Sequence, residues 1–218
     1  MYVPNKRYKY YLQGGSLMTE LEMQSFEENI NELRQENISL NISTTFNDTD
    51  GIYIWEFSSY LEKLVFDDAD ECHEKSVVSQ SGGYIIPSNM DFDYTVYSSQ
   101  KELCDSISGD LLTAYTAVAD YEGNIKRNIL NDVGLDEDEV IDTGIAIIED
   151  ISYIELRYLR KYLNLFDVFI EGLPVRNCRL VVVLFNWDRE SESIKLFLDY
   201  GWRIKSVDYG AAVAYRNI

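Results

Sequence analysis

The clearest pattern near the start of the chain is an alternation over Ile38–Phe46, in which Ile38, Leu40, Ile42, Thr44 and Phe46 occupy one set of positions. A period of two residues is typical of a β-strand with one buried face. The turn-forming run Asn47-Asp-Thr-Asp-Gly51 follows, and Ile52–Phe57 is again rich in strand-forming residues. Turn residues between two such segments predict a β-hairpin.

The last third of the chain has the most regular pattern. Its best marker is Lys195–Trp202, where a helical pattern ends on Gly201 and passes directly into a strand. Glycine is the residue that most often ends a helix. The predicted elements are strands Gly144–Glu149 and Tyr153–Tyr158, helix Leu163–Gly172, strand Arg179–Phe185, helix Glu190–Tyr200, and paired strands Arg203–Tyr209 and Ala211–Arg216.

The remaining segments have weaker patterns, and the fold of residues 58–130 is nearly unconstrained. Thr19-x-x-Glu22 is a capping box that predicts a helix running to about Glu36. The other predicted elements are helix Ser58–Lys75, short strands Tyr84–Ile86 and Tyr94–Tyr97, and helix Leu111–Leu130 with an interruption near Gly123. Together these patterns predict an α/β (or α+β) fold with a mixed, mostly antiparallel sheet flanked by helices.

Composition adds a charge division to this picture. The chain has 218 residues and a net charge of −19, with 46% hydrophobic residues, which is typical of a globular protein. Residues 1–17 carry +3, residues 18–150 carry −24 and residues 151–218 carry +2. We expect a basic arm over 1–17, an acidic region over 18–110 and a third region over 111–218, or one compact domain over 18–218.

The charge restricts the class of partner. The acidic part should repel nucleic acid, because binding to phosphates depends on Lys and Arg. It should attract a protein with a basic surface; plain solubility is the alternative explanation.

Cysteine use and hydropathy bear on location. The three cysteines are widely spaced, which favours a reducing compartment over a disulfide framework. No apolar run approaches the ~20 residues that span a membrane, and no secretory signal is recognisable. We therefore expect a cytoplasmic protein of a bacterium or its host, with a virion as the alternative. Richness in Asn, Ile, Tyr and Asp is typical of an AT-rich genome, such as that of a phage or a low-GC bacterium.

Several other kinds of site are disfavoured. His73 is the only histidine, and its sequence neighbour Cys72 would diverge from it on a helix, so a nucleophile–base pair is not expected. A calcium loop aligned on Gly51 would place Phe46 and Phe57 at positions that need carboxylates. Motifs for phosphate-cradling loops, zinc sites and nucleic-acid binding are not found, and we expect no metal.

Three segments carry a resemblance to a known family. Tyr153–Leu156, Arg179–Phe185 and Phe197–Trp202 resemble the fourth strand, the fifth strand and the Tyr-x-x-x-Gly-Phe segment of the GCN5-related N-acetyltransferases (GNAT). The resemblance covers about 75 residues. It implies a hairpin, a helix whose N-terminal loop binds the pyrophosphate of acetyl-CoA, then a strand, a helix and a closing hairpin.

The cofactor loop departs from the family pattern Gln/Arg-x-x-Gly-x-Gly/Ala, whose glycines let backbone N–H groups approach phosphates at a helix N-terminus. The best alignment places Arg160 at the first position, and Leu163 and Leu165 at the two glycines. If acetyl-CoA binds, the resemblance implies that Arg157, Arg160 and Lys161 hold its phosphates.

The catalytic positions also differ. The tyrosine that serves as general acid in the family corresponds to Phe197, which has no hydroxyl. In an active protein Tyr200 would replace it, and Glu155 would be the general base.

Three hypotheses follow. The first is a catalytically degenerate acetyltransferase-like protein that works by binding another macromolecule. The second is an active N-acetyltransferase that uses acetyl-CoA through an atypical cofactor loop. The third is an acidic DNA mimic, of the kind that some phages encode, or a structural or assembly protein.

Overall fold

The computed structural model describes residues 36–47, 54–66, 72–89, 92, 94–136, 143–164, 178–186, 191–207 and 210–217. One seven-stranded sheet runs through it, with the strand order β1-β2-β3-β4-β5-β7-β6. All neighbouring strands are antiparallel except β4 and β5, which are parallel. The elements are β1 Ile38–Asn47, β2 Ile54–Phe66, β3 Cys72–Ile86, α3 Gln100–Ile107, α4 Gly109–Val118, α5 Arg127–Val133, β4 Gly144–Tyr153, α6 Leu156–Asn164, β5 Cys178–Asn186, α8 Ser191–Asp199, β6 Arg203–Ser206 and β7 Ala211–Asn217.

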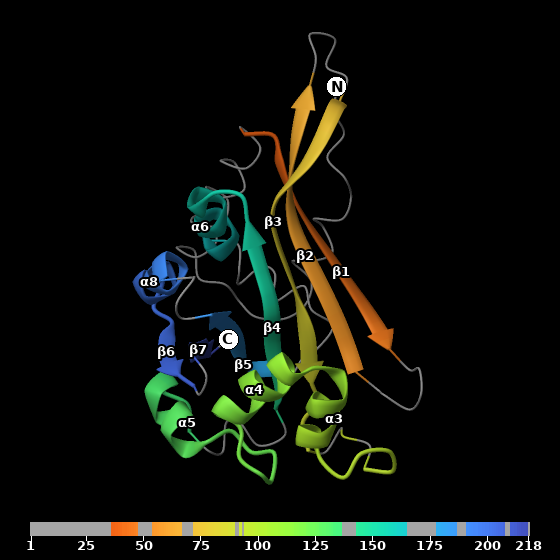
Figure 1. Cartoon of the computed structure of the whole chain (residues 1–218), viewed down its shortest axis with the longest axis vertical. Helices are drawn as coiled ribbons and strands as arrows, with labels where there is room; N and C mark the ends of the chain where they lie inside the picture. The colour runs from red at the N-terminus through yellow and green to blue at the C-terminus, as the bar shows by residue number, and fades with distance from the viewer. Residues whose placement is uncertain are drawn as a thin grey trace.

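Helices cover both faces of the sheet (Figure 1). On one face, α6 and α8 pack over a core that includes Leu159, Val183 and Phe197. On the other face, α3, α4 and α5 pack over a second core that includes Leu111 and Val182. The fold is therefore the expected α+β class, with a mixed and mostly antiparallel sheet between helices.

Several predicted elements are confirmed. Ile38–Phe46 lies in β1 and pairs with β2 as an antiparallel hairpin. In the last third, β5, α8, β6 and β7 follow each other as predicted, and β6 pairs with β7. The single sheet contains strands from both sides of residue 110; the division into regions there stays a prediction.

Three predictions for the middle of the chain are wrong. Ser58–Lys75 is not a helix, because its first half continues β2 and pairs with β1 on one side and β3 on the other. Tyr94–Tyr97 forms no strand and lies in a turn before α3. Leu111–Leu130 is two helices, separated by a turn in which Gly123 has a φ of 86°.

The predicted strand Tyr153–Tyr158 is also wrong, since β4 ends at Tyr153 and α6 begins at Leu156. The last strand pairing of β4 with β3 is Tyr153 to Ser79, and the chain turns away there although β3 itself extends to Cys72. Beyond Tyr153, Leu156, Leu159 and Leu163 recur at helical spacing on one face. The helix predicted from Leu163 therefore begins seven residues earlier. Residues 165–172, the helix before Glu36 and the basic arm lie outside the described residues.

A buried hydroxyl cluster joins α6 to the sheet. The Tyr162 hydroxyl lies 2.9 Å from Ser59 Oγ and 2.5 Å from Ser81 Oγ, and the two serine oxygens are 3.0 Å apart. We expect Tyr162→Phe to lower the free energy of unfolding by about 1 kcal/mol, because the serines keep each other as partners. Chemical denaturation at pH 7 measures this. Tyr121→Phe, at a side chain that is 83% exposed, is the control and should change stability little; an equal loss in both variants would contradict the prediction.

Tyr162 also makes the stability of the fold depend on pH in the alkaline range. Burial raises the pKa of Tyr162 to about 12, although its hydrogen bonds to Ser59 and Ser81 act in the opposite direction. The unfolded chain ionises a tyrosine near pH 10. This contribution to stability is therefore complete below about pH 10 and is lost as the pH rises toward 12.

Candidate functional site

The parallel strands β4 and β5 separate part-way along their length. They pair only from Gly144 to Ile148, where Ile148 lies opposite Val183. Beyond this point β4 continues against β3 as far as Tyr153, while β5 continues against β7. The sheet therefore opens between two neighbouring strands, and such a point is where an open sheet containing parallel strands most often presents functional groups.

A β-bulge lies at this opening. Gly83 of β3 is opposite Ile148, and Gly82 is opposite Asp150, so Glu149 is the extra residue on β4. A Cβ on Gly83 would overlap the carbonyl oxygen of Ile147, and only glycine permits this approach. Because a bulge turns two successive side chains toward one face, Glu149 points to the α3–α4 side together with Asp150.

Side chains from three other elements surround the Glu149 carboxylate. The Ser108 hydroxyl donates a hydrogen bond to it, and the same Ser108 oxygen accepts the N–H of Leu111 at 2.9 Å as the N-cap of α4. Burial raises the pKa of the Tyr84 phenol, and the charges of Glu56 and Glu149 raise it further. The positive end of the α4 dipole therefore lies beside the Glu149 carboxylate and favours a negative charge there.

The neighbouring thiol is not a nucleophile. Cys104 is buried, and burial followed by the charge of Glu149 raises the pKa of its thiol to about 12. Since the thiolate is the reactive form, Cys104 is inert at neutral pH. Between Cys104 and Glu149, the candidate for proton transfer is therefore Glu149. The sequence prediction missed it by placing it at the end of a strand, although the Gly82-Gly83 pair is a recognisable bulge signal.

The connection from β4 to α6 is only two residues long, Ile154 and Glu155. The Ile154 N–H donates to the carbonyl of Val78 at 3.0 Å. Glu155, predicted to lie on a strand, lies in this connection, and its carboxylate is 3.0 Å from Nε of Arg157. The Glu155 carboxylate, paired with Arg157, therefore lies directly before the first turn of α6.

The predicted phosphate-binding residues have different neighbours. The Arg157 guanidinium also lies over the Tyr158 ring, 4.7 Å from its centroid. Lys161 Nζ is 2.7 Å from a carboxylate oxygen of Glu36. Arg160 is exposed and lies near Tyr200, whose pKa is raised by burial and lowered to a smaller extent by Arg160.

One of the two leucines aligned with the family glycines can be placed in the structure. Leu163 lies in the last turn of α6, 4% exposed in the core, and not in a loop. Leu165 is outside the described residues.

Phe197, at the position that corresponds to the family's general acid, belongs to the hydrophobic core. Phe197 is fully buried on α8, and its ring meets Phe185 and Trp202 edge to face, with both centroid distances 4.8 Å. Nearby, the Tyr153 hydroxyl at the end of β4 hydrogen-bonds with Ser193 on α8. This contact connects the end of β4 to the helix that follows β5.

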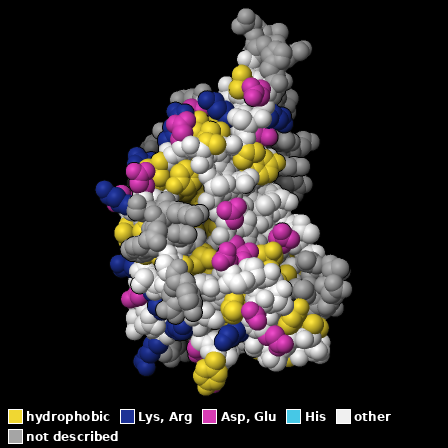
Figure 2. Space-filling view, viewed as in Figure 1, with side chains coloured by type: hydrophobic (Ala, Val, Ile, Leu, Met, Phe, Trp, Pro, Cys, Tyr) yellow, Lys and Arg dark blue, Asp and Glu magenta, His cyan; other side chains and the backbone are white. Residues whose placement is uncertain are grey.

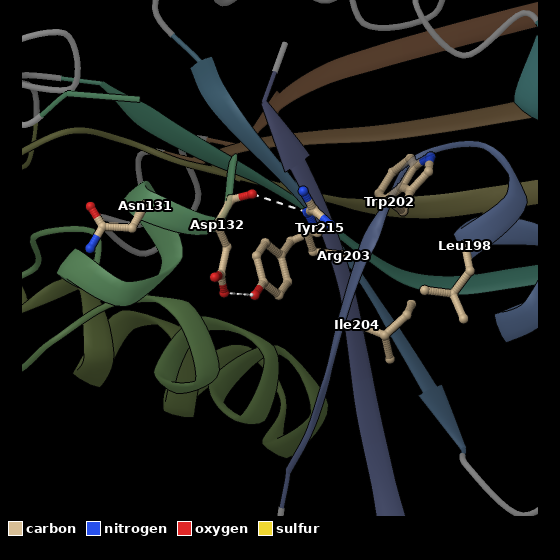
Figure 3. Close-up of a pocket in the computed structure, with 7 residues that line it drawn as sticks. All are labelled: Asn131, Asp132, Leu198, Trp202, Arg203, Ile204 and Tyr215. Carbon is tan, nitrogen blue, oxygen red and sulfur yellow. Dashed lines mark hydrogen bonds between the residues drawn. The ribbon is translucent and has the colours of Figure 1, made fainter. Parts of the chain in front are cut away.

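A separate hollow of about 470 Å³ lies beside β6 (Figure 3). The Tyr215 hydroxyl donates to the Asp132 carboxylate at 2.7 Å, and Arg203 Nε donates to the Asp132 carbonyl at 3.0 Å. Burial and then the bond to Asp132 raise the pKa of Tyr215. The lining of the hollow contains none of the groups around Glu149. Its other residues are Asn131, Leu198, Trp202 and Ile204.

Two further properties belong to the described part of the chain. Within it, no three His, Cys, Asp or Glu side chains are grouped as metal ligands. None of its helices is both long enough and apolar enough to cross a membrane.

Comparison with known proteins gives similarity to solved structures. No family model matches the chain, and no curated protein sequence matches it. Among solved structures, the chain is similar to Arabidopsis thaliana NAA60 in complex with a bisubstrate analogue, with a TM-score of 0.38 and 10% sequence identity over 75% of each chain.

Proposed function

We propose that this chain is a non-catalytic binding protein with an acetyltransferase-like sheet, and that it acts on a macromolecule with a basic surface. The observation that carries the proposal is the two-residue connection between β4 and α6. The strand and helix order from β4 onward agrees with the resemblance seen in the sequence. The resemblance also implies a cofactor loop and a general-acid tyrosine, and the described residues leave no space for either.

The connection is too short for the family's cofactor loop, whose pattern alone spans six residues. It also contains no glycine, so its backbone N–H groups have no open approach to a pyrophosphate. Glu155 adds a negative charge before the first turn of α6, where a phosphate would need donors. These features argue against acetyl-CoA binding in the family's manner.

The general-acid position supports the same conclusion. Phe197 provides no proton, and its ring is enclosed by Phe185 and Trp202. Adding a hydroxyl there would place a polar group among aromatic rings, at a cost of about 1–3 kcal/mol if it found no partner. We expect Phe197→Tyr to be less stable than the parent and to gain no acetyl transfer.

The test is calorimetric titration of the full chain with acetyl-CoA and, separately, with CoA. We expect no saturable heat at ligand concentrations up to about 1 mM. Micromolar affinity for either ligand would overturn the proposal, because it would require a phosphate site despite the short connection. A thermal melt of the same sample serves as the control that the protein is folded.

The partner class follows from charge. Residues 18–150 carry a net charge of −24, so association with a basic protein should be fast and strongly weakened by salt. This field favours a protein partner over direct binding of nucleic acid. An acidic DNA mimic is the special case in which the partner is itself a nucleic-acid-binding protein.

Glu149 is the observation that favours a second candidate, an acyl-CoA-dependent N-acetyltransferase. A carboxylate at the opening between β4 and β5, bonded to Ser108, could take a proton from an acceptor amine. In that case Glu149, and not Glu155, would be the base. The titration with acetyl-CoA decides between the two candidates.

A further inference from the structure

One face of the sheet changes from apolar to polar along the strands. On the side of α3 and α4, the apolar core ends at Ile54, Ile86 and Ile147. The next positions on this side are polar, and strand pairing places them in three cross-strand rows. We name these residues the polar sheet face: Thr45, Glu56 and Tyr84; Ser43, Ser58, Gly82 and Asp150; and Asn41, Tyr60, Gln80 and Ser152.

This face is open to solvent. Ser43, Glu56, Ser58, Gln80 and Asp150 are all exposed. In the described part of the chain, α4 packs against β4 and β5 near one end of the sheet, and the upper parts of β1 to β3 in Figure 1 have no helix in front of them. The hydroxyl and amide groups of these three rows are therefore available for hydrogen bonds.

The charge on this face has one sign. Glu56 and Asp150 lie on it, and Glu149 lies at its margin. The polar sheet face contains no Lys or Arg; on the same side Lys75 lies farther along β3, paired with Glu62 at 3.7 Å. Figure 2 shows magenta side chains among white and yellow ones in the middle of the view.

We propose that the polar sheet face docks an extended, Lys- and Arg-rich segment of a partner protein. This inference rests on the proposed function, because it assigns the place at which the basic partner binds. Ammonium and guanidinium groups would pair with Glu56 and Asp150, and the serine, threonine and glutamine side chains between them would satisfy the segment's remaining polar groups. Nucleic acid and anionic lipid surfaces carry the wrong charge for this face.

The shape of the face favours an extended segment. Rows along a strand repeat about every 7 Å, which is the spacing of alternate side chains on an extended chain, and neighbouring strands lie about 4.8 Å apart. The polar sheet face crosses four strands, β1 to β4, so a segment of several residues can contact both carboxylates at once.

The experiment measures fluorescence anisotropy of a labelled oligolysine peptide of about ten residues with the full chain, in about 50 mM and 300 mM salt. We expect Glu56→Gln with Asp150→Asn to weaken binding about tenfold at low salt. The matched control is Glu192→Gln with Asp199→Asn, which removes the same charge from exposed positions on α8; it should weaken binding no more than about threefold. A second variant, Ser58→Lys, places a cation in the middle of the face without removing a carboxylate and should also weaken binding.

Each outcome is decisive. Equal weakening by the two double variants would mean that the peptide follows net charge, which overturns the docking face and leaves the proposed function standing. No binding by the parent protein at low salt would overturn the proposed function and this inference with it. Affinity that does not change with salt would exclude charge pairing as the cause.

Discussion

Gly83→Ala is expected to destabilise the fold by about 3 kcal/mol or more, a large part of the stability of a typical domain. A Cβ at this position would lie 2.9 Å from the carbonyl carbon of Ile147 and the Cα of Ile148, and it would overlap the Ile147 oxygen. These are backbone atoms of β4, which cannot move without breaking the bulge. The midpoint of urea unfolding measures the loss.

The control for this substitution is the neighbouring glycine. A Cβ on Gly82 would have its nearest contact, the Phe57 carbonyl oxygen, at an ordinary 3.8 Å. We expect Gly82→Ala to leave stability within about 1 kcal/mol of the parent. Similar losses at both positions would mean that the strand, and not the bulge, is sensitive to alanine. Such a result would remove the structural basis for the position of Glu149.

Phe197→Ala is expected to cost about 3–5 kcal/mol, the range for removing a buried phenylalanine side chain. Phe197 is enclosed by Phe185 and Trp202, and the loss includes two edge-to-face ring contacts. The same urea unfolding experiment measures it. A large loss would support the structural role of this ring at the position where the family has a catalytic hydroxyl.

Leu198→Ala is the matched control, because Leu198 is the next residue on α8 and its side chain is 52% exposed. We expect its effect to stay within about 0.5 kcal/mol. A loss at Leu198 as large as that at Phe197 would show that α8 is sensitive as a helix, and not through the aromatic contacts of Phe197.

The candidate site was the least predictable part of the molecule. The resemblance suggested Glu155 as a base on a predicted strand over Tyr153–Tyr158. In the structure β4 ends at Tyr153, Glu155 lies in the connection, and α6 begins at Leu156. Glu149 became a candidate only when pairing placed the bulge at the opening between β4 and β5. Residue spacing along the sequence does not encode how close the Glu149 carboxylate lies to side chains on other elements of the fold.

The local pattern by itself determined the strands and helices whose burial repeats regularly. Ile38–Phe46 alternates because one side of β1 faces a core, and Lys195–Trp202 shows a helix that ends on Gly201, whose φ is 80°. The charge division between residues 18–150 and 151–218 was likewise complete in the sequence.

Only the tertiary structure decided the features that depend on neighbouring strands. Ser58–Phe66 is a strand because β1 and β3 satisfy its backbone groups on both sides. The two-residue connection before α6 is set by where β3 stops pairing with β4. The physical reason is common to both: backbone hydrogen bonds between distant segments overrule a weak local preference, and side-chain periodicity carries no information about which segments will meet.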